Sequence, residues 1–467
     1  MDASLDNNWI ENEFKQINCN DTRLNRRFIK VAQSMMASPS DNIHQAMEDW
    51  TESKGAYRLF DNENLQREEI IFTHAQNTLY RANSTEKKEI LLAIQDATTV
   101  NYTHHPKKKG LKNLHQQESY ANSMKGFHLH NVLLMTESGL PLGMLRQEVF
   151  QNEGSLVHHK QRPIEDKKSY HWLQGLQATA EIQERTIIHI CDREADIYEF
   201  FMEAEKLNQY YIIRASKDRR LATGPETLRT VMNAEHVSGE VEITVPGNGK
   251  RKERKAILKI RYKQVKLKAP QRALAAQREP LKDLEVYVIF ALECNPPGDY
   301  EALDWVLLSN YPVASFEESL QCLKRYRFRW NIEEYHKILK SGCNIEECQL
   351  QTFERVNKFI ALMSVIAFRL FFMTLVNRVC PDDSCVVILK KHEWEALCLS
   401  TTKTLPVEPP TVREAVRMIA KLGGFLGRNS DGEPGITVIW RGWDKLQTIA
   451  EFYFSTRDNK EIEKRYG

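Results

Sequence analysis

The sequence RTIIHICD at residues 185–192 is a short apolar run that ends in an aspartate, and EILLAIQD at residues 89–96 repeats this pattern. Continuous apolar runs of this length are typical of strands that are buried in a sheet. In α/β proteins, ligands usually lie at the ends of neighbouring strands. Asp96 and Asp192 are therefore candidate site residues, although a single aspartate in such a place is more often a turn or cap residue.

Three more apolar runs, at residues 127–136, 141–150 and 210–216, also predict strands. Helical patterns occupy about 167–182 and 194–207. Strands that alternate with helices indicate an α/β core, here with a mixed sheet. From about residue 218 to 300 the helical period gives way to short strand-like runs with Gly and Pro punctuation, which predicts a β insertion.

The β insertion contains a strongly basic strand. Ten of the nineteen residues from Lys250 to Lys268 are Lys or Arg, and they alternate with apolar residues. This pattern places positive charge along one exposed face of a strand. DNA contact is one interpretation, and a protected sheet edge is an equally good one, since lysines also prevent edge-to-edge pairing.

The candidate aspartates suit a metal site. Two or three carboxylates that converge from different elements provide the oxygen ligands that Mg²⁺ or Mn²⁺ prefers in phosphoryl transfer. A long helix that begins after Ser315 offers a third carboxylate. Glu318 gives this helix a capping-box spacing, and no Gly or Pro follows before Gly342.

Four polar residues are expected on one face of that helix. Tyr326, Glu333 and Lys340 are seven residues apart, and Arg329 lies four residues before Glu333. A spacing of seven drifts only about 20° around a helix. The column is a candidate site, and an ordinary salt-bridged surface is the alternative.

The two ends of the chain read as helical. In the N-terminal part, four basic residues lie away from the apolar stripe of a helix and either face solvent or dock on phosphates: Arg23, Arg26, Arg27 and Lys30. In the C-terminal part we expect self-association or an intramolecular core through a second stripe: Met418, Ile419, Leu422 and Phe425.

The length of the chain indicates a protein of two to four domains. The chain has 467 residues, a net charge of +2 and nine cysteines without a CxxC pair, so neither a disulfide framework nor a zinc ribbon is indicated. We find no apolar run of the roughly 20 residues that a membrane span needs. The first residues lack the features of a secretory signal, so a cytoplasmic protein without a membrane partner is expected.

At this point the sequence resembles the DDE transposases of the bacterial insertion-sequence-four family, in particular their Tn-five branch. Four blocks carry the resemblance: QDATT at 95–99, CDREADIYEF at 191–200, DWVLLSNYPV at 304–313 and YRFRWNIEEYHKILKSG at 326–342. The last block contains the family's Y-(2)-R-(3)-E-(6)-K signature as Tyr326, Arg329, Glu333 and Lys340. Further blocks at 54–62, 418–428 and 439–447 extend the resemblance over nearly the whole chain.

The resemblance implies an α/β fold with a ribonuclease-H-like catalytic core and a β-strand insertion. Helical domains for DNA binding and dimerisation would flank this core at its N-terminal and C-terminal ends. We expect the boundaries at residues 1–70, 71–373 and 374–467, with the insertion at about 218–300.

It also implies the chemistry. Asp96, Asp192 and Glu333 correspond to the family's metal-binding carboxylates, which would hold two Mg²⁺ ions, with Mn²⁺ as a substitute. The expected function is cut-and-paste transposition of double-stranded DNA. A homodimer would pair the transposon ends, cleave them by hydrolysis and hairpin formation, and join the 3′ ends to target DNA, within the bacterial cytoplasm and its nucleoid.

DNA-binding roles follow for further residues. Tyr326, Arg329 and Lys340 would hold phosphates near the scissile bond, and Trp305 would receive a base removed from the stack. Arg214 resembles a DNA-facing residue of the family. Arg26, Arg27 and Lys30 are predicted to contact DNA on the basis of their charge alone. The alternatives are a structure-selective nuclease of the same fold and an inactive DNA-binding regulator.

Overall fold

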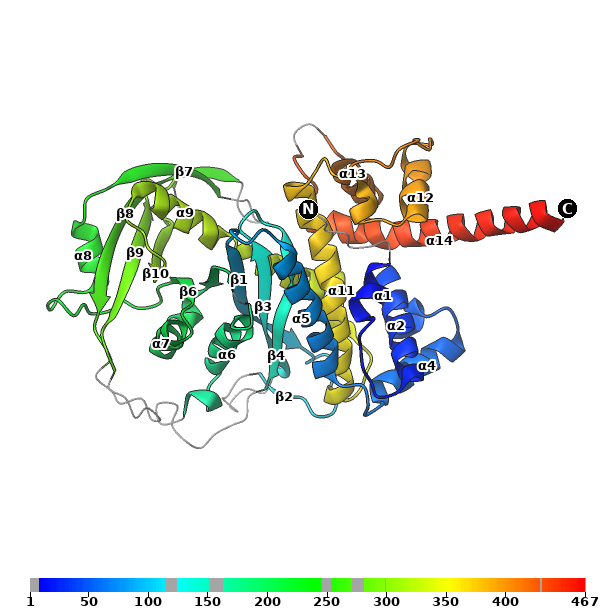
Figure 1. The fold of residues 1–467 in the computed structure, drawn as a ribbon, viewed down its shortest axis with the longest axis horizontal. Helices are drawn as coiled ribbons and strands as arrows, with labels where there is room; N and C mark the ends of the chain where they lie inside the picture. The colour runs from blue at the N-terminus through cyan, green and yellow to red at the C-terminus, as the bar shows by residue number, and fades with distance from the viewer. Residues whose placement is uncertain are drawn as a thin grey trace. The chain divides into compact units, whose positions relative to one another are not determined.

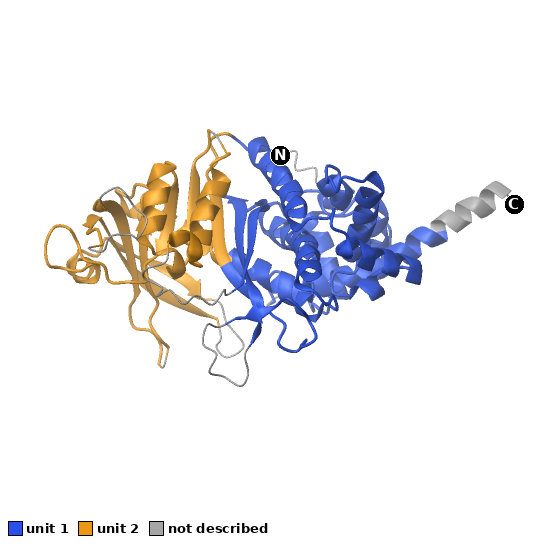
Figure 2. Cartoon of the chain, turned by 90° about the horizontal axis from the view of Figure 1, so that it is seen from below, with its two compact units in different colours: residues 1–86, 97–154, 331–467 blue, residues 87–96, 155–330 orange. Residues whose placement is uncertain are grey.

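The computed structural model describes residues 8–114, 124–151, 163–182, 184–245, 253–270, 281–298, 300–428 and 431–466. The chain forms two compact units, coloured separately in Figure 2. Unit 1 comprises residues 1–86, 97–154 and 331–467, and unit 2 comprises residues 87–96 and 155–330. Strand β1 (Leu91–Asn101) and helix α10 (Trp330–Lys337) each contribute residues to both units.

Unit 2 is built on a mixed sheet. Its strands follow the order β1, β5, β6, β10, β9, β8 and β7; the β1–β5 and β5–β6 pairs are parallel, and the others are antiparallel. The bounds are β5 (Ile187–Cys191), β6 (Tyr210–Arg214), β7 (Gly239–Val245), β8 (Arg254–Leu267), β9 (Leu284–Glu293) and β10 (Asp304–Ser309). The predicted α/β core with a mixed sheet is confirmed.

Helices complete unit 2. They are α6 (Tyr170–Thr179), α7 (Tyr198–Lys206), α8 (Leu228–Ala234) and α9 (Phe316–Arg327), with 3-10 turns η2 (Ile164–Asp166) and η3 (Arg193–Ala195). Helices α6 and α7 lie side by side near the parallel strands (Figure 1). Their apolar faces enter one core with the sheet, where Leu176, Phe200 and Tyr211 are almost fully buried. This burial supplies the main favourable free energy of folding in the unit.

The β insertion is present between β6 and β10. Strands β7, β8 and β9 form an antiparallel ribbon in which β8 is fourteen residues long. Residues 250–252 at the start of the basic stretch lie outside the described residues. The predicted strand character is confirmed at β7, β8 and β9, whereas the expectation that the helical period disappears is wrong at α8, which lies within residues 218–300.

Unit 1 combines an antiparallel meander with helices. Strands β3 (Lys125–Thr136) and β4 (Pro141–Phe150) pair with each other, β2 (Lys112–Asn113) pairs with β3, and β3 neighbours β1. The N-terminal helices are α1 (Trp9–Phe14), α2 (Thr22–Ala37), α3 (Ile43–Ala46), α4 (Trp50–Asp61) and α5 (Arg67–Ser84). The helical character predicted for the first seventy residues is confirmed.

A long helix, α11 (Phe353–Val379), forms the centre of unit 1 (Figure 1). By length and composition it is the one helix among the described residues that could cross a membrane. The expectation that no apolar run reaches this length is therefore wrong. Its most apolar stretch is completely buried inside the protein, as in the core helix of a globular domain, so its hydropathy is explained by packing.

The C-terminal helices are α12 (Lys391–Thr401), α13 (Val412–Leu422) and α14 (Ile436–Tyr466), after a 3-10 turn η6 (Cys385–Val387). Met418 is nearly buried and Ile419 fully buried within the chain itself. The self-association predicted for this stripe is wrong at these two positions, because packing of α13 against α14 already covers them. The intramolecular core is the correct alternative at these two positions, whereas Leu422 and Phe425 are half-buried and self-association through them stays a prediction.

The single long helix predicted after Ser315 is also wrong. Helix α9 ends at Arg327 and α10 begins at Trp330, because the Arg329 amide bonds to the Tyr326 carbonyl, three residues back, at 3.0 Å. Farther along, a π-helical turn η4 (Ile338–Gly342) and a 3-10 turn η5 (Ile345–Glu347) follow. The four residues of the predicted column are therefore spread over α9, the turn after it, α10 and η4, and their alignment on one face stays a prediction.

Candidate active site

Of the two candidate aspartates, Asp192 directly follows β5, as predicted, whereas Asp96 lies inside β1, which continues to Asn101, and not at the end of that strand. β1 and β5 run parallel, with Ala93 paired to His189 and Ile94 paired to Ile190. Asp96 and Asp192 each lie two residues beyond the last of these pairs. Since side chains alternate along a strand and the backbone of Asp192 is still extended, we expect both aspartates on the face of Ile94 and Ile190, next to each other.

Local structure holds Asp192 in place. Its Oδ1 accepts a hydrogen bond of 2.8 Å from the Glu194 amide and caps the 3-10 turn η3. Burial raises the pKa of the Cys191 thiol, and the charges of Asp192 and Asp96 raise it further. Two carboxylates therefore act on one buried position, which is the concentration of negative charge that a cation site requires.

Basic and aromatic side chains surround this pair. Arg329 Nη1 lies 3.5 Å from Asp96 Oδ2, and both side chains are less than one-fifth exposed. Burial raises the pKa of Tyr326 to about 12, while Arg329 and Arg214 oppose the rise. The ring of Trp305 lies edge-on to that of Tyr326, with centroids 6.1 Å apart. The structure thus brings Asp96, Arg329, Tyr326 and Trp305 to one region of unit 2.

Arg214 has a structural partner. Its guanidinium donates to the carbonyl of Asp304 at 3.0 Å, linking β6 to β10. Burial lowers its pKa, and the charge of Arg193 lowers it further. Arg214 therefore lies in the same positive region as Tyr326 and Arg329, even though one of its donors bonds to the neighbouring strand.

The remaining two residues of the signature, Glu333 and Lys340, belong to unit 1. Glu333 is half-buried in the first turn of α10, whose buried face contains Ile332, Tyr335 and His336. Lys340 Nζ lies 3.6 Å from Glu346 Oε1. Among the described residues, no three His, Cys, Asp or Glu side chains gather as a metal-binding group. The convergence of Glu333 with the aspartates therefore stays a prediction.

A buried network anchors the helix that carries Glu333. His336 Nε2 and Asn131 Nδ2 are 2.9 Å apart, and Asn131 Oδ1 accepts from Gln147 Nε2 at 2.9 Å. The Gln147 amide also donates to Ser364 Oγ at 2.8 Å. Burial lowers the pKa of His336 to about 3, so this histidine is a neutral packing residue that ties α10 to β3, β4 and α11.

The basic residues of α2 differ in their surroundings. Lys30 forms an ion pair with Glu52 on α4. The guanidinium of Arg27 lies over Gly55, where a Cβ would come within 2.0 Å of Nη1, so the glycine permits this close packing. Arg26 is exposed. Lys30 and Arg27 thus help to join α2 to α4, a role that charge alone did not predict.

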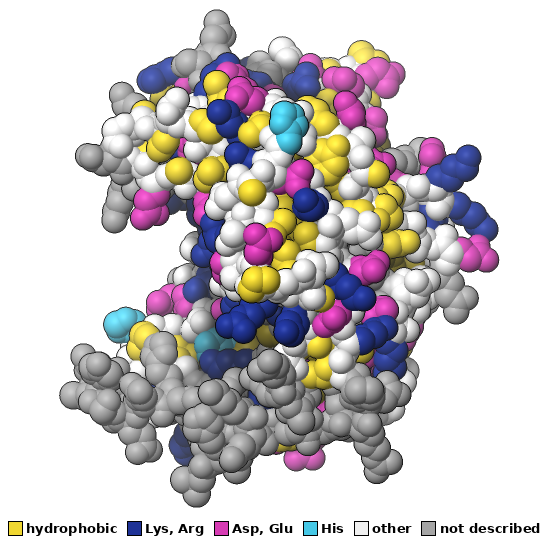
Figure 3. Space-filling model, turned by 90° about the vertical axis from the view of Figure 1, so that its left-hand side faces the viewer, with side chains coloured by type: hydrophobic (Ala, Val, Ile, Leu, Met, Phe, Trp, Pro, Cys, Tyr) yellow, Lys and Arg dark blue, Asp and Glu magenta, His cyan; other side chains and the backbone are white. Residues whose placement is uncertain are grey.

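The basic strand β8 is largely neutralised by its neighbours. Lys255 pairs with Glu242 at 2.6 Å, and Lys263 pairs with Glu235 at 2.5 Å. Arg254 forms an ion pair with Glu293 of β9. Lys and Arg side chains lie interspersed with Asp and Glu on the face drawn in Figure 3. These ion pairs weaken the case for a continuous DNA-binding strip. The protected-edge interpretation is wrong, because β8 pairs with β7 on one side and with β9 on the other and is not an edge strand.

Asp196 was not singled out from the sequence. It is 1% exposed and accepts hydrogen bonds from the Ser216 amide at 2.7 Å and from Arg219 Nε at 2.9 Å. These bonds tie the loop after Asp192 to the loop after β6. The only sequence signal for this role was the presence of Asp196 as the second aspartate of the CDREAD block. Its partners Ser216 and Arg219 follow β6, so their contact with Asp196 could not be read from the sequence.

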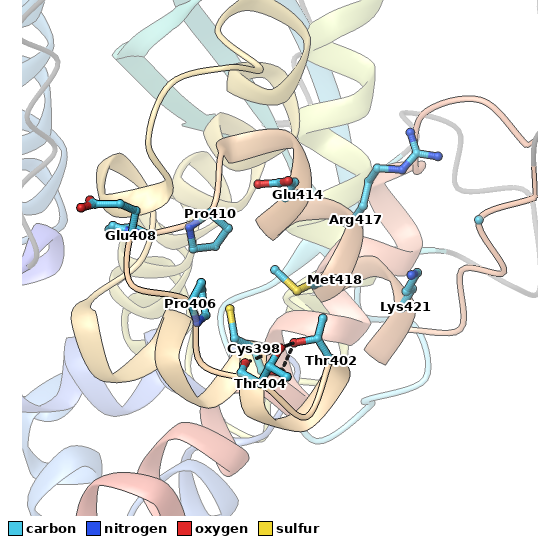
Figure 4. Close-up of a pocket in the computed structure, with 12 residues that line it drawn as sticks. Cys398, Thr402, Thr404, Pro406, Glu408, Pro410, Glu414, Arg417, Met418 and Lys421 are labelled. Atoms are coloured by element: carbon cyan, nitrogen blue, oxygen red, sulfur yellow. Dashed lines mark hydrogen bonds between the residues drawn. The ribbon is translucent and has the colours of Figure 1, made fainter.

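A separate cavity of about 550 Å³ lies in the C-terminal part of unit 1, between the end of α12, residues 402–410 and α13 (Figure 4). Two of its charged residues have structural partners. Glu414 closes the capping box of α13 with Thr411, and Arg417 pairs with Glu433 at 3.2 Å. The lining contains none of the predicted catalytic residues, so this cavity is not the candidate active site.

Three protein families match the chain in succession. Residues 6–65 match the family described as transposase DNA-binding, and residues 87–369 match the transposase DDE domain. Residues 365–463 match the transposase Tn5 dimerisation domain. The second match alone spans more than half of the chain and includes both aspartates, Glu333 and the residues around them.

Proposed function

The chain belongs to the family of DDE transposases, and on this premise we propose that it is a cut-and-paste enzyme that excises and inserts DNA. The resemblance inferred from the sequence blocks is confirmed by matches to DNA-binding, DDE and Tn5 dimerisation families. The chain is thus a DNA transposase that binds DNA and dimerises. Its reaction steps, metal and individual site residues are the substance of the proposal.

One observation carries the proposal. Asp96 and Asp192 stand at equivalent positions of two parallel strands, and Arg329 lies 3.5 Å from Asp96. Aligned carboxylates next to a guanidinium can hold a cation and a phosphate in the same place. A purely DNA-binding regulator has no need of the carboxylate pair.

We assign Glu333 as the third metal ligand and Mg²⁺ as the natural metal, with Mn²⁺ as a substitute. The donor set fits this choice, because its members are carboxylates and hard cations prefer oxygen ligands. When bound, a pair of such ions supplies stabilisation of the attacking and leaving oxygens at phosphorus. The DDE family itself implies the use of a divalent metal.

The reaction then proceeds by in-line displacements at phosphorus. Water attacks the phosphodiester at the transposon end and releases a 3′-hydroxyl. That hydroxyl attacks the opposite strand to form a hairpin, and a second water opens the hairpin. The 3′-hydroxyl finally attacks target DNA, so each step forms one P–O bond and breaks another without a covalent protein intermediate.

Side chains of the protein orient the DNA in these steps. Arg329, Tyr326 and Lys340 hold phosphates beside the scissile bond, since a guanidinium, a hydroxyl and an ammonium all donate to phosphate oxygens. Trp305 receives the base that leaves the stack during hairpin formation. Its ring is partly exposed and supported by Tyr326, which suits a stacking platform. Arg214 adds positive charge near Tyr326 and Arg329.

We assign residues 1–70 to DNA binding, 71–373 to catalysis and 374–467 to dimerisation, supported by the three family matches. Among the three basic residues of α2 predicted to contact DNA, Arg26 is the strongest candidate, because Arg27 and Lys30 contact α4. Two copies would pair the transposon ends. The ring of Phe452 on α14 is exposed, with 71% of its surface accessible, and is a candidate contact between the two copies. We expect this dimer to act in the bacterial nucleoid.

A joining assay separates this function from a nuclease of the same fold. Purified protein is incubated with pre-cut transposon ends, a target plasmid and Mg²⁺ or Mn²⁺. We expect ends joined to the plasmid through their 3′-hydroxyls, and no joining by Asp192→Ala. Cleavage of uncut ends without any joining of pre-cut ends would instead identify a structure-selective nuclease.

A further inference from the structure

A chain of buried hydrogen bonds lies beneath the aspartate pair in unit 2. Gln95, which immediately precedes Asp96, is fully buried, and its Nε2 lies 2.8 Å from Nδ1 of His189. On the other side of the ring, His189 Nε2 lies 3.0 Å from Thr179 Oγ1. The chain therefore joins β1, β5 and α6, and it includes the residue next to a candidate metal ligand.

The hydrogen bonds run in a single direction. The Thr179 hydroxyl donates to the Leu176 carbonyl at 2.9 Å, so its oxygen accepts from His189 Nε2–H. His189 Nδ1 is then an acceptor for the Gln95 amide. Burial lowers the pKa of His189 to about 3, which keeps the ring neutral and suited to these roles. Gln209 also donates to Thr179 Oγ1, at 2.8 Å, and extends the chain towards β6.

This chain occupies the face of the sheet opposite to the aspartates. Because side chains alternate along a strand, Gln95 and Asp96 point to opposite faces. Helix α6 covers the Gln95 side, where a Cβ at Gly175 would lie 2.1 Å from Gln95 Oε1. A shift of β1 by one residue would exchange the two faces and remove Gln95 from its partner.

The apolar residues of these strands do not define the register well. Residues 91–94 and 187–190 include adjacent apolar side chains that are buried on both faces, so a shifted strand would still bury apolar groups. The polar pair discriminates between registers. A shift would leave the Gln95 amide and the His189 ring without partners, and each such buried group costs roughly 1–3 kcal/mol.

We propose that Gln95 and His189 are positioning residues that lock β1 and β5 in the register that places Asp96 beside Asp192. They act from the opposite face of the sheet and touch neither DNA nor metal. This inference rests on the proposed function only where it concerns metal binding. The register itself can be measured in the protein without DNA or metal.

The test uses the full-length double variant Gln95→Leu/His189→Leu and the control Ile94→Val, which trims a buried side chain of the same strand. Removing both polar partners together limits the loss of stability. We expect amide hydrogen exchange in residues 91–96 and 187–192 to accelerate at least tenfold in the double variant. We also expect its Mn²⁺ affinity, measured by calorimetry, to fall at least tenfold, with Ile94→Val within twofold of wild type.

The outcomes distinguish the two claims. Unchanged exchange in the double variant, or faster exchange with unchanged Mn²⁺ affinity, would overturn the positioning role. Wild-type protein whose Mn²⁺ binding does not depend on Asp192 would contradict the proposed metal site, while the exchange result would still test whether Gln95 and His189 hold β1 and β5 together. If the double variant does not fold, Thr179→Val tests the far end of the hydrogen-bond chain. We then expect exchange in residues 91–96 and 187–192 to be about threefold faster and the Mn²⁺ affinity to be about threefold weaker.

Discussion

Asp96 and Asp192 occupy equivalent positions on two neighbouring parallel strands, each two residues beyond the Ile94–Ile190 pair. The pairing of the two strands thus brings together carboxylates from two sequence blocks that are far apart along the chain. Arg329 lies next to the pair at 3.5 Å from Asp96. The positive charge balances the aspartates and also suits a phosphate, so the same few residues can organise a metal and a DNA strand.

Glu333 is expected to be essential for cleavage and dispensable for binding. Glu333→Gln removes a charged metal ligand worth several kcal/mol in the transition state, so cleavage should fall more than about 100-fold. Binding to a transposon end should stay within about twofold on a native gel. Glu334→Gln is the control, because Glu334 pairs with Arg378 at 3.7 Å; equal cleavage by the two variants would exclude Glu333 from the site.

Arg329→Lys is expected to reduce cleavage although it keeps the charge. Lysine cannot offer the paired N–H groups that a guanidinium presents to phosphate, and the loss of one charged hydrogen bond corresponds to about 10- to 100-fold. Single-turnover cleavage at saturating protein measures this effect. Arg327→Lys, at an exposed position two residues earlier, should behave as wild type, and a similar loss there would point to general charge instead.

Trp305→Ala is expected to impair hairpin formation selectively. Stacking of one base on an aromatic ring contributes about 1–3 kcal/mol, so the hairpin rate should fall about 5- to 150-fold while the first nick is nearly unchanged. Trp305→Phe should recover most of the loss. The exposed Trp330, with 58% of its surface accessible, provides the comparison, and a hairpin defect confined to Trp330→Ala would reassign the role.

Asp444 predicts a pH dependence of stability. Burial and the charge of Asp41 together raise its pKa to about 6, although the hydrogen bond from Ser40 opposes the rise. The charged form is therefore disfavoured in the folded protein, and the cost grows from about pH 4 to pH 6 and persists above. Asp444→Asn should stabilise the protein at pH 8 by up to about 2 kcal/mol after allowance for solvent screening.

The gain from the same substitution should shrink to at most about 0.5 kcal/mol near pH 4, where Asp444 is protonated in the folded state and about half ionised in the unfolded state. Thermal unfolding at the two pH values measures the difference. Ser40→Ala, which removes the hydrogen bond to the carboxylate, should destabilise the protein at pH 8. A gain from Asp444→Asn that is equal at both pH values would show that packing, and not charge, is responsible.

Local patterns in the sequence predicted much of the fold. The apolar runs that end at Asp96 and Asp192 are strands, because burial on both faces leaves a clear mark on composition. The break between Arg327 and Trp330 was missed, since it uses neither Gly nor Pro and depends on tighter hydrogen bonds at Phe328 and Arg329. A capping box at Ser315 defines where a helix begins and says little about where it ends.

Contacts between distant segments could not be read from the sequence. Lys30 meets Glu52 on another helix, and the glycine of the KGAYR block accommodates Arg27. Partners of Lys255 and Lys263 are acids contributed by neighbouring segments. A prediction based on the Lys and Arg residues of a single element therefore overestimated the basic surface available to DNA, because the acidic partners come from other elements of the fold.

The most direct measurement of the central claim compares wild type with Asp192→Ala on candidate transposon ends in the presence of Mg²⁺ or Mn²⁺. We expect metal-dependent nicks, hairpins and joined products from wild type, and end binding without any of these products from the variant. Asp192→Ala that cleaves as fast as wild type would contradict the assignment of the aligned carboxylates as the metal site.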